Sequence, residues 1–282
     1  MSLQTESLMM DLDTSFDFAR PGDYRTLSAM WQQCFGQTRE DAQFFLKNSY
    51  RPGETLLLRD PSGTPVSMIT LIPARLQNTP GSFLYAAATK PQLQSGGLMS
   101  RLFSMTQDYA ASQGARFLCA APSDERIAAA LDKHGFTYRF YRSERFIDDL
   151  VPYSHYELWT PSAIDFTVMR AAYLQKQRTQ LRLMCPDFIL QELRHFGGDV
   201  VCFEQDGRIG YAAYTLHDNT LHIRECSLPF TDELGASLLA DTGCTSILLN
   251  ESGTEIPVGM YKALGRDPFH PFQGSMSLCL DQ

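Results

Sequence analysis

The stretch TKPQLQSGGLM, Thr89–Met99, lies between a strand-like run and a helix-like run. The run Phe83–Thr89 before it is apolar and short, as buried strands are. After it, apolar residues four, three and four positions apart predict one face of a helix: Leu98, Leu102, Met105 and Tyr109. Glycines let a backbone come close to a ligand, and the free N–H groups at a helix start face an anion. The stretch therefore predicts a local anion site.

The elements around this stretch in the first half alternate between strands and helices. We expect a helix capped by Asp23, a β-hairpin turning at Asp60–Gly63, and a helix ended by Gly135. The expected strands and helices are Tyr24–Cys34 (helix), Thr55–Arg59, Pro65–Ile72, Phe83–Thr89, Arg116–Ala121, Asp124–Lys133 (helix) and Thr137–Phe146. The first residues, 1–17, show no sustained pattern and are expected to be a tail.

The second half repeats part of this order. A second hairpin turns at Gln205–Gly207, and it is followed by a strand, a helix, a strand and a helix. The expected ranges are Val200–Phe203, Ile209–Thr215, Leu221–Cys226, Thr231–Ala240 (helix), Ser246–Leu249 and Pro257–Leu264 (helix), ended by Gly265. We therefore expect two related α/β units in tandem, 18–150 and 151–282, joined near Val151–Pro152, with the glycine loop replaced by Ser227–Phe230 in the second.

Composition restricts the class of protein. With 44% hydrophobic residues, 20% charged residues and a net charge of -8, the 282-residue chain can bury a core and is a poor general partner for nucleic acid. Neither a membrane span nor a basic, apolar leader is visible, so we expect a cytoplasmic protein. The seven scattered cysteines predict no disulfide framework, and the six histidines show no metal-ligand spacing, the pair His217 and His222 reading as a strand flank.

The chain resembles the GNAT superfamily of acyl-CoA-dependent N-acyltransferases. Gln94, Ser95, Gly96 and Gly97 match that family's Q-x-x-G-x-[G/A] signature, with Thr89 and Pro91 at the expected upstream offsets and Met99 in place of the small last residue. Leu118–Ser123 and the pair Gly135–Phe136 resemble the strand and helix that follow, so the likeness covers roughly Phe18–Phe146. A dinucleotide-binding fold would require G-x-G-x-x-G, and a P-loop would require G-K-[ST]; neither is present. The resemblance implies an α/β GNAT fold, a mixed central sheet flanked by helices, with a degenerate second copy.

The family's activity implies a cofactor and a reaction. An acetyl group would move from acetyl-CoA to the primary amine of a small molecule by direct attack of the amine on the thioester. The family's cofactor loop maps onto Ala87, Ala88, Thr89, Gln94, Ser95, Gly96, Gly97, Leu98, Met99 and Ser123. Two interpretations of Ser123 stay open: a cofactor contact or the cap of the following helix.

The usual proton-transfer residues of the family are absent. The tyrosine acid of many members falls on Leu131, and the glutamate base of some falls on Phe83. The nearest protic candidates are Tyr85, Tyr138 and, in the second unit, Glu225. Aromatic residues on strands are usually core or cleft-wall residues, so the two tyrosines are more often structural than catalytic. Tyr261, four residues before Gly265, matches the tyrosine position but also reads as a buried helix residue.

These gaps leave two functions open. The first is an N-acetyltransferase acting on an unidentified amine. The second is an acyl-CoA-binding protein without catalysis that serves as a sensor or scaffold. Without a strong base, an α-amino acceptor of pKa about 7.7 to 8.0 suits the enzyme better than a lysine-like amine of pKa about 10.4.

Overall fold

The computed structural model describes residues 13–48, 54–177, 179–266, 269 and 273–277. Contacts divide the chain into two compact units. Unit 1 holds the described residues of Met1–Pro73, Pro80–Ala120 and Ala263–Asp267, and unit 2 holds those of Ala74–Thr79, Ala121–Lys262 and Pro268–Gln282. The expected domain limits, 18–150 and 151–282, stay a prediction.

Unit 1 is built on a mixed sheet. Its strands, in spatial order, are β1 (Ser15–Phe18), β2 (Thr55–Arg59), β3 (Pro65–Leu76), β4 (Thr79–Thr89) and β5 (Phe117–Ala120). β1 pairs with β2 and β2 with β3 in antiparallel register, whereas β4 and β5 are parallel. The hairpin between β2 and β3 turns where expected, because Asp60 accepts the N–H groups of Ser62 and Thr64 and Gly63 takes a φ of 83°.

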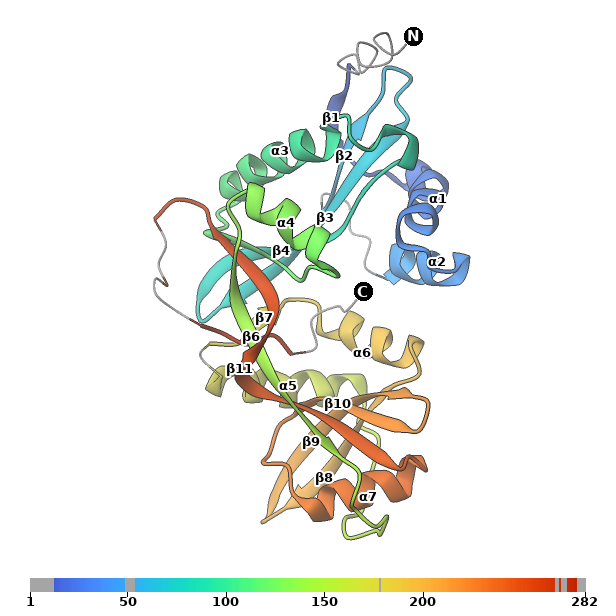
Figure 1. Ribbon diagram of the computed structural model, residues 1–282, viewed down its shortest axis with the longest axis vertical. Helices are drawn as coiled ribbons and strands as arrows, with labels where there is room; N and C mark the ends of the chain where they lie inside the picture. Colours follow the sequence, from blue (N-terminus) through green and yellow to red (C-terminus); the bar gives the residue numbers. More distant parts are fainter. Residues whose placement is uncertain (1–12, 49–53, 178, 267–268, 270–272, 278–282) are drawn as a thin grey trace, which may run out of the picture. The chain divides into compact units, whose positions relative to one another are not determined.

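Helices cover both faces of this sheet. Figure 1 shows α1 (Tyr24–Phe35) and α2 (Arg39–Asn48) on one side of the strands and α3 (Leu98–Ser112) on the other. Each helix buries one face: Leu27, Met30 and Trp31 from α1, Ala42 and Phe45 from α2, and Leu102 and Phe103 from α3. Trp31 stacks on Phe45 at 4.6 Å, so α1 and α2 share one aromatic core.

A buried ion cluster joins β1, β2 and the start of α1. The guanidinium of Arg59 contacts Asp17 at 2.6 Å and Asp23 at 2.7 Å, and it donates to the carbonyl of Phe18 at 3.0 Å. Arg59 is 7% exposed, so its charge depends on these partners. The carboxylate of Asp23 therefore binds Arg59 and the N–H of Arg20, and its side chain makes no capping bond to α1.

Unit 2 contains the remaining elements. They are α4 (Glu125–Lys133), β6 (Thr137–Ile147), α5 (Ala163–Lys176), β7 (Leu181–Leu183), α6 (Pro186–His195), β8 (Asp199–Gln205), β9 (Arg208–His217), β10 (Thr220–Cys226), α7 (Asp232–Thr242) and β11 (Ser246–Ala263). β8, β9 and β10 form an antiparallel meander, and β10 then pairs in parallel with β11. Figure 1 shows α7 on one face of these strands and α5 and α6 on the other.

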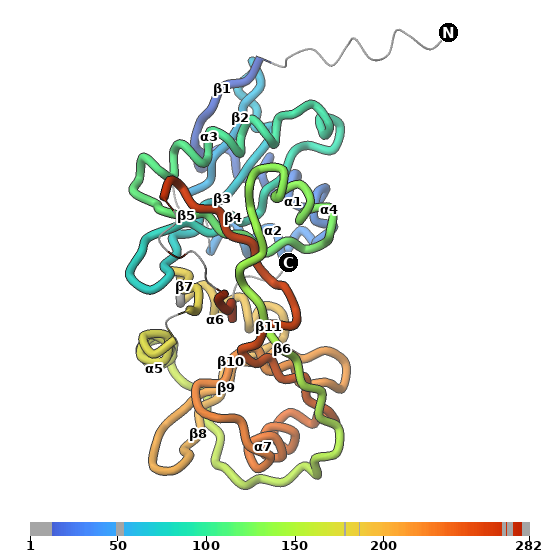
Figure 2. The backbone as a smooth tube through the Cα atoms, turned by 60° about the vertical axis from the view of Figure 1, so that its left-hand side comes forward, coloured from blue at the N-terminus to red at the C-terminus, as the bar shows by residue number. Residues whose placement is uncertain are grey.

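The long strands β6 and β11 pair with each other in antiparallel register (Figure 2). Their pairing runs from Ile147–Ile247 to Thr137–Tyr261, with bulges near Ile256 and Pro257. The prediction of a helix over Pro257–Leu264 is wrong, because this segment belongs to β11. Proline lacks a ladder donor, and the strand accommodates Pro257 at an irregularity in the pairing.

Other expectations are confirmed or corrected. The two hairpins, the helices after Asp23, Gly97, Asp124 and Thr231, and the strand before the glycine stretch all form. The segment expected as a tail already contains β1 from Ser15 on; its first twelve residues lie outside the described chain. The helices α2, α5 and α6 were not predicted.

Candidate functional site

The parallel strands β4 and β5 pair over a very short distance. Ser82 lies opposite Leu118 and Phe83 opposite Cys119, after which β5 ends at Ala120 while β4 continues to Thr89. Ala86 has a φ of 50°, an uncommon value for a residue with a side chain, and it breaks the regular alternation of β4. Ala87 is exposed between buried neighbours, so β4 reaches the surface at this residue.

The far end of β4 is held by side chains. The hydroxyl of Ser67 donates to the carbonyl of Ala88 at 3.2 Å and lies 2.8 Å from the hydroxyl of Thr89. The carbonyl of Thr89 accepts from the thiol of Cys34 at 3.3 Å and from the amide of Gln94 at 3.2 Å. Gln94 therefore fixes the loop against the strand that precedes it.

The loop itself turns sharply and is open. After a 3-10 turn at Pro91–Leu93, Ser95 and Gly97 take φ values of 75° and 74°, and Gly97 is the N-cap of α3. Residues 94–97 are exposed, and Met99 is partly buried. A Cβ built on Gly97 would meet no atom within 4 Å, so the space above the turn is free.

The start of α3 has the properties of an anion site. Gly97 offers no side-chain cap, and the first turn contains no acidic residue. The first N–H groups of a helix have no partner within the helix, and the helix dipole adds positive potential there. Buried Leu98 anchors the first turn in unit 1. A phosphate group would receive backbone hydrogen bonds here, as the sequence predicts.

The residues proposed for proton transfer lie in different surroundings. Tyr85 on β4 is 3% exposed, and its ring contacts Trp31 at 5.8 Å and Phe45 at 5.2 Å. Tyr138 on β6 is partly buried and lies opposite Met260 of β11. Leu131 and Phe83, which occupy the family's acid and base positions, are both buried. Tyr261 is also buried, on a strand rather than a helix.

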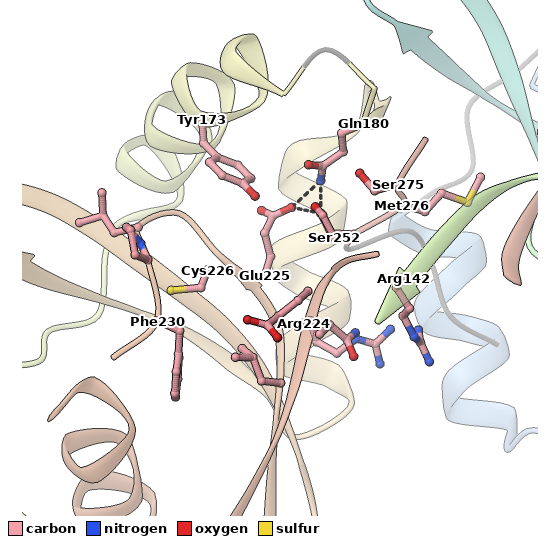
Figure 3. Close-up of a pocket in the computed structure, with 16 residues that line it drawn as sticks. Arg142, Tyr173, Gln180, Arg224, Glu225, Cys226, Phe230, Ser252, Ser275 and Met276 are labelled. Carbon is pink, nitrogen blue, oxygen red and sulfur yellow. Dashed lines mark hydrogen bonds between the residues drawn. The ribbon is translucent and has the colours of Figure 1, made fainter. Parts of the chain in front are cut away.

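Glu225 on β10 lies in a closed network within unit 2 (Figure 3). Arg170 reaches one carboxylate oxygen through Nε at 2.9 Å, Tyr211 donates to the same oxygen at 2.6 Å, and Gln180 and Ser277 donate to the other. Burial acts to raise the pKa of Glu225, but the Arg170 charge and these hydrogen bonds outweigh it and lower the pKa.

This network makes Glu225 a weaker proton acceptor than a free carboxylate, because both oxygens are already engaged. Sequence reasoning missed Arg170 and Gln180. A cation spaced four residues after Phe166 and four before Leu174, on the buried stripe of α5, was the available signal.

The structure separates the two interpretations of Ser123. The cap of α4 is Asp124, whose carboxylate accepts the N–H of Ile127 at 2.8 Å. Ser123 precedes the cap and is exposed, so the capping interpretation is wrong and the cofactor contact stays a prediction.

In the described part of the chain, no cluster of three or more histidine, cysteine, aspartate or glutamate side chains could hold a metal ion. Within the same residues, no helix combines the length and the apolar character needed to cross a membrane.

Comparisons with known proteins agree with this geometry. Residues 15–139 match the model of the acetyltransferase (GNAT) domain, and no curated protein matches the sequence. A GCN5-related N-acetyltransferase from Anabaena variabilis superposes with a TM-score of 0.71 at 13% identity, over 90% of this chain and 73% of that one. Eis1 from Mycobacterium abscessus superposes with a TM-score of 0.63 at 11% identity, over 89% of this chain and 74% of that one. The fold is therefore a GNAT fold, and within it residues 15–139 are similar to the GNAT acetyltransferase domain.

Proposed function

We propose that the protein is an N-acetyltransferase that moves an acetyl group from acetyl-CoA to the primary amine of a small molecule. The observation that carries the proposal is the start of α3, an exposed glycine turn with no acidic neighbour at the open end of β4. The match of residues 15–139 to the acetyltransferase domain supports it.

The backbone of Ala87–Thr89 and the loop Gln94–Met99 would hold acetyl-CoA. The pyrophosphate would bind the N–H groups at the start of α3, where a diphosphate gains both hydrogen bonds and the helix dipole. The pantetheine arm would run along the backbone at exposed Ala87, where β4 has no β5 partner. Exposed Ser123 is a further proposed contact.

The reaction would be a direct attack. The amine nitrogen forms a bond to the thioester carbon, the carbon–sulfur bond breaks, and the sulfur leaves as thiolate while the nitrogen loses a proton. A thiol of pKa about 8.5 is a tolerable leaving group near neutral pH, so the base matters more than the acid. Tyr85, Tyr138 and Glu225 are the proposed ends of a proton path, and the contacts of Glu225 favour the tyrosines.

We propose further that unit 2 is a degenerate copy of the same fold that holds no CoA. Its strands follow the order β8-β9-β10-β11, with a parallel last pair, as β2-β3-β4-β5 do in unit 1. Trp159 adds one antiparallel bridge to β8 at Cys202. Between β10 and α7 it has Ser227–Phe230 in place of glycines.

Two measurements on the full chain test the function. Calorimetry with acetyl-CoA should show one site per chain, and a thiol dye should report CoA release with amino acids, polyamines or aminoglycosides. Binding without release on any amine would replace the enzyme by the acyl-CoA sensor or scaffold. Absence of acetyl-CoA binding would contradict both functions.

A further inference from the structure

A second candidate site lies wholly within unit 2, where β10 and β11 separate. The two strands pair in parallel only as far as Ile223 and Leu249. Beyond that point β10 pairs with β9 and β11 pairs with β6. A pocket of about 240 Å³ opens between the diverging ends (Figure 3). Of the residues that line this pocket, the proposed acyl transfer involves Glu225 alone, and the contacts of Glu225 favour the tyrosines in that role.

Two apolar residues that line this pocket, Leu228 and Phe230, pack onto glycines of unit 2. Leu228 packs over Gly210, whose Cβ would approach it at 2.6 Å, and Phe230 packs against Gly235. Thr231 caps α7 by accepting the N–H of Leu234, and Asp232 and Glu233 occupy the first turn. These carboxylates would repel a pyrophosphate at this helix start.

Two arginines line the pocket from different strands. Arg142 comes from β6 and Arg224 from β10 (Figure 3). The Nε of Arg142 is buried, and no described residue accepts its hydrogen bond, although another nitrogen of the same side chain contacts Glu144 at 2.7 Å. Burial lowers the pKa of nearby His222, and the charges of Arg224 and Arg142 lower it further. The two charges therefore act on the same part of unit 2.

Besides Glu225, the exposed acid Glu251 lines the pocket, and the remaining walls supply neutral polar and apolar surface. Glu225 is the only pocket-lining acid that is buried among the described residues, and its charge is balanced by Arg170 at 2.9 Å. Gln180 and Ser277 donate to Glu225. Leu249 and Met276 add apolar contact area. A monoanion with a small body matches these walls, whereas a dianion would lie too near the Glu225 carboxylate.

We infer that this pocket binds a small carboxylic acid, whose carboxylate is held by Arg142 and Arg224 and whose body packs on Leu249 and Met276. Guanidinium groups match a planar carboxylate with paired hydrogen bonds. The pocket, of about 240 Å³, has room for a metabolite of amino-acid size. Free amino acids and simple organic acids share this chemistry.

Thermal unfolding of the full chain without acyl-CoA tests the inference. The probes are glycine, alanine and glutamate in one arm and acetate and pyruvate in another, each at about 10 mM, with the dianion succinate as a control that should not bind. At least one acid should raise the Tm by about 2 °C or more, and its uncharged amide should not. Calorimetry should then show one site. The responding arm identifies the source of the carboxylate.

Three variants locate the site. Arg142→Gln should weaken binding about tenfold or more, and the matched Arg208→Gln, a change of an exposed arginine on β9, should leave it unchanged. Ser252→Trp, at an exposed position of the lining, should block the pocket without touching the core. The inference is wrong if no carboxylate binds, if inorganic phosphate or acetyl-CoA displaces the acid, or if Arg142→Gln and Ser252→Trp both bind as tightly as the unmodified protein.

Discussion

The two strand-to-helix junctions of the protein have the same place in their units and opposite chemistry. After β4, the chain turns through exposed glycines and starts α3 with no acid and no side-chain cap. After β10, it passes through Leu228 and Phe230 and starts α7 with Thr231 as cap and two acids. At the first junction no side chain caps the N–H groups of the helix, whereas at the second the side chain of Thr231 accepts the N–H of Leu234.

This difference means that the fold of a unit does not by itself predict whether the unit binds a phosphate. The strand order is repeated, so topology alone does not decide whether a junction can receive a phosphate. In the proposed division, the four residues Ser227–Phe230 prevent phosphate binding after β10. The bulky apolar side chains among them pack into unit 2, whereas the glycines after β4 have no side chain to pack. Leu228 and Phe230 pack against the core that contains Val201, Phe203 and Leu234.

The largest expected effect is on the first junction. Gly97→Glu should weaken acetyl-CoA binding at least about a thousandfold, about 4 kcal/mol, because the new side chain enters the free space above the turn with a negative charge. Gly114→Glu is the matched control: it has a φ of 88° and equally open space at the other end of α3. Equal affinity of the Gly97 variant and the unmodified protein, measured by calorimetry, would remove the cofactor from this loop.

The units should also differ in their dependence on pH. Burial raises the pKa of Glu192 on α6 to about 8, from 4.5. The folded state therefore holds a proton that the unfolded chain releases, and stability falls as the pH rises between about 4.5 and 8, by about 3 kcal/mol from pH 5 to pH 8. Glu192→Gln should remove this loss. Urea unfolding at both pH values measures it.

In unit 1 the stability should depend on pH in the opposite direction and fall as the pH is lowered. Arg59 lowers the pKa of Asp23, and hydrogen bonds and Arg59 lower that of Asp17 against the effect of burial. Their contribution is present above the unfolded pKa and is lost as the pH falls below about 4. Acid unfolding that is unchanged in Arg59→Met, once its lower stability at pH 7 is subtracted, would contradict this assignment.

A smaller effect is expected at the second junction. Phe230→Ala should lower the free energy of unfolding by about 2 kcal/mol, because the partly buried ring leaves a cavity against Gly235, and should leave acetyl-CoA affinity unchanged. Phe146→Ala, a change at a 60% exposed ring, should cost less than about 0.5 kcal/mol. If Phe230→Ala weakened acetyl-CoA binding, the division between the two junctions would fail.

The smallest expected effects concern catalysis. Tyr138→Phe or Tyr85→Phe should lower kcat about tenfold or more with KM for acetyl-CoA unchanged, whereas Glu225→Gln should act mainly through the stability of its network. The pH dependence of the rate for each variant separates these cases. Fast turnover of a lysine-like amine at pH 7, with no variant changed tenfold, would show that another group removes the proton.

The sequence by itself determined the local parts of this fold. The glycine turn, both hairpins and the amphipathic helices α1, α3 and α4 depend on short-range geometry, namely positive φ at Gly63, Gly97 and Gly135 and apolar spacing within one element. For the same reason the exposed glycine turn at the start of α3 lies where the sequence predicts it, and its role as an anion site stays a prediction.

Only the tertiary structure decided the rest. The segment Pro257–Leu264 has apolar spacing that a helix could use, but its partner strand β6 begins at Thr137, far away in sequence, and that pairing makes it part of β11. Arg170 interrupts the apolar stripe of α5, and its burial is explained by the ion pair with Glu225. The pocket forms where β10 and β11 separate. Such features depend on contacts between residues distant in sequence, which local patterns do not encode.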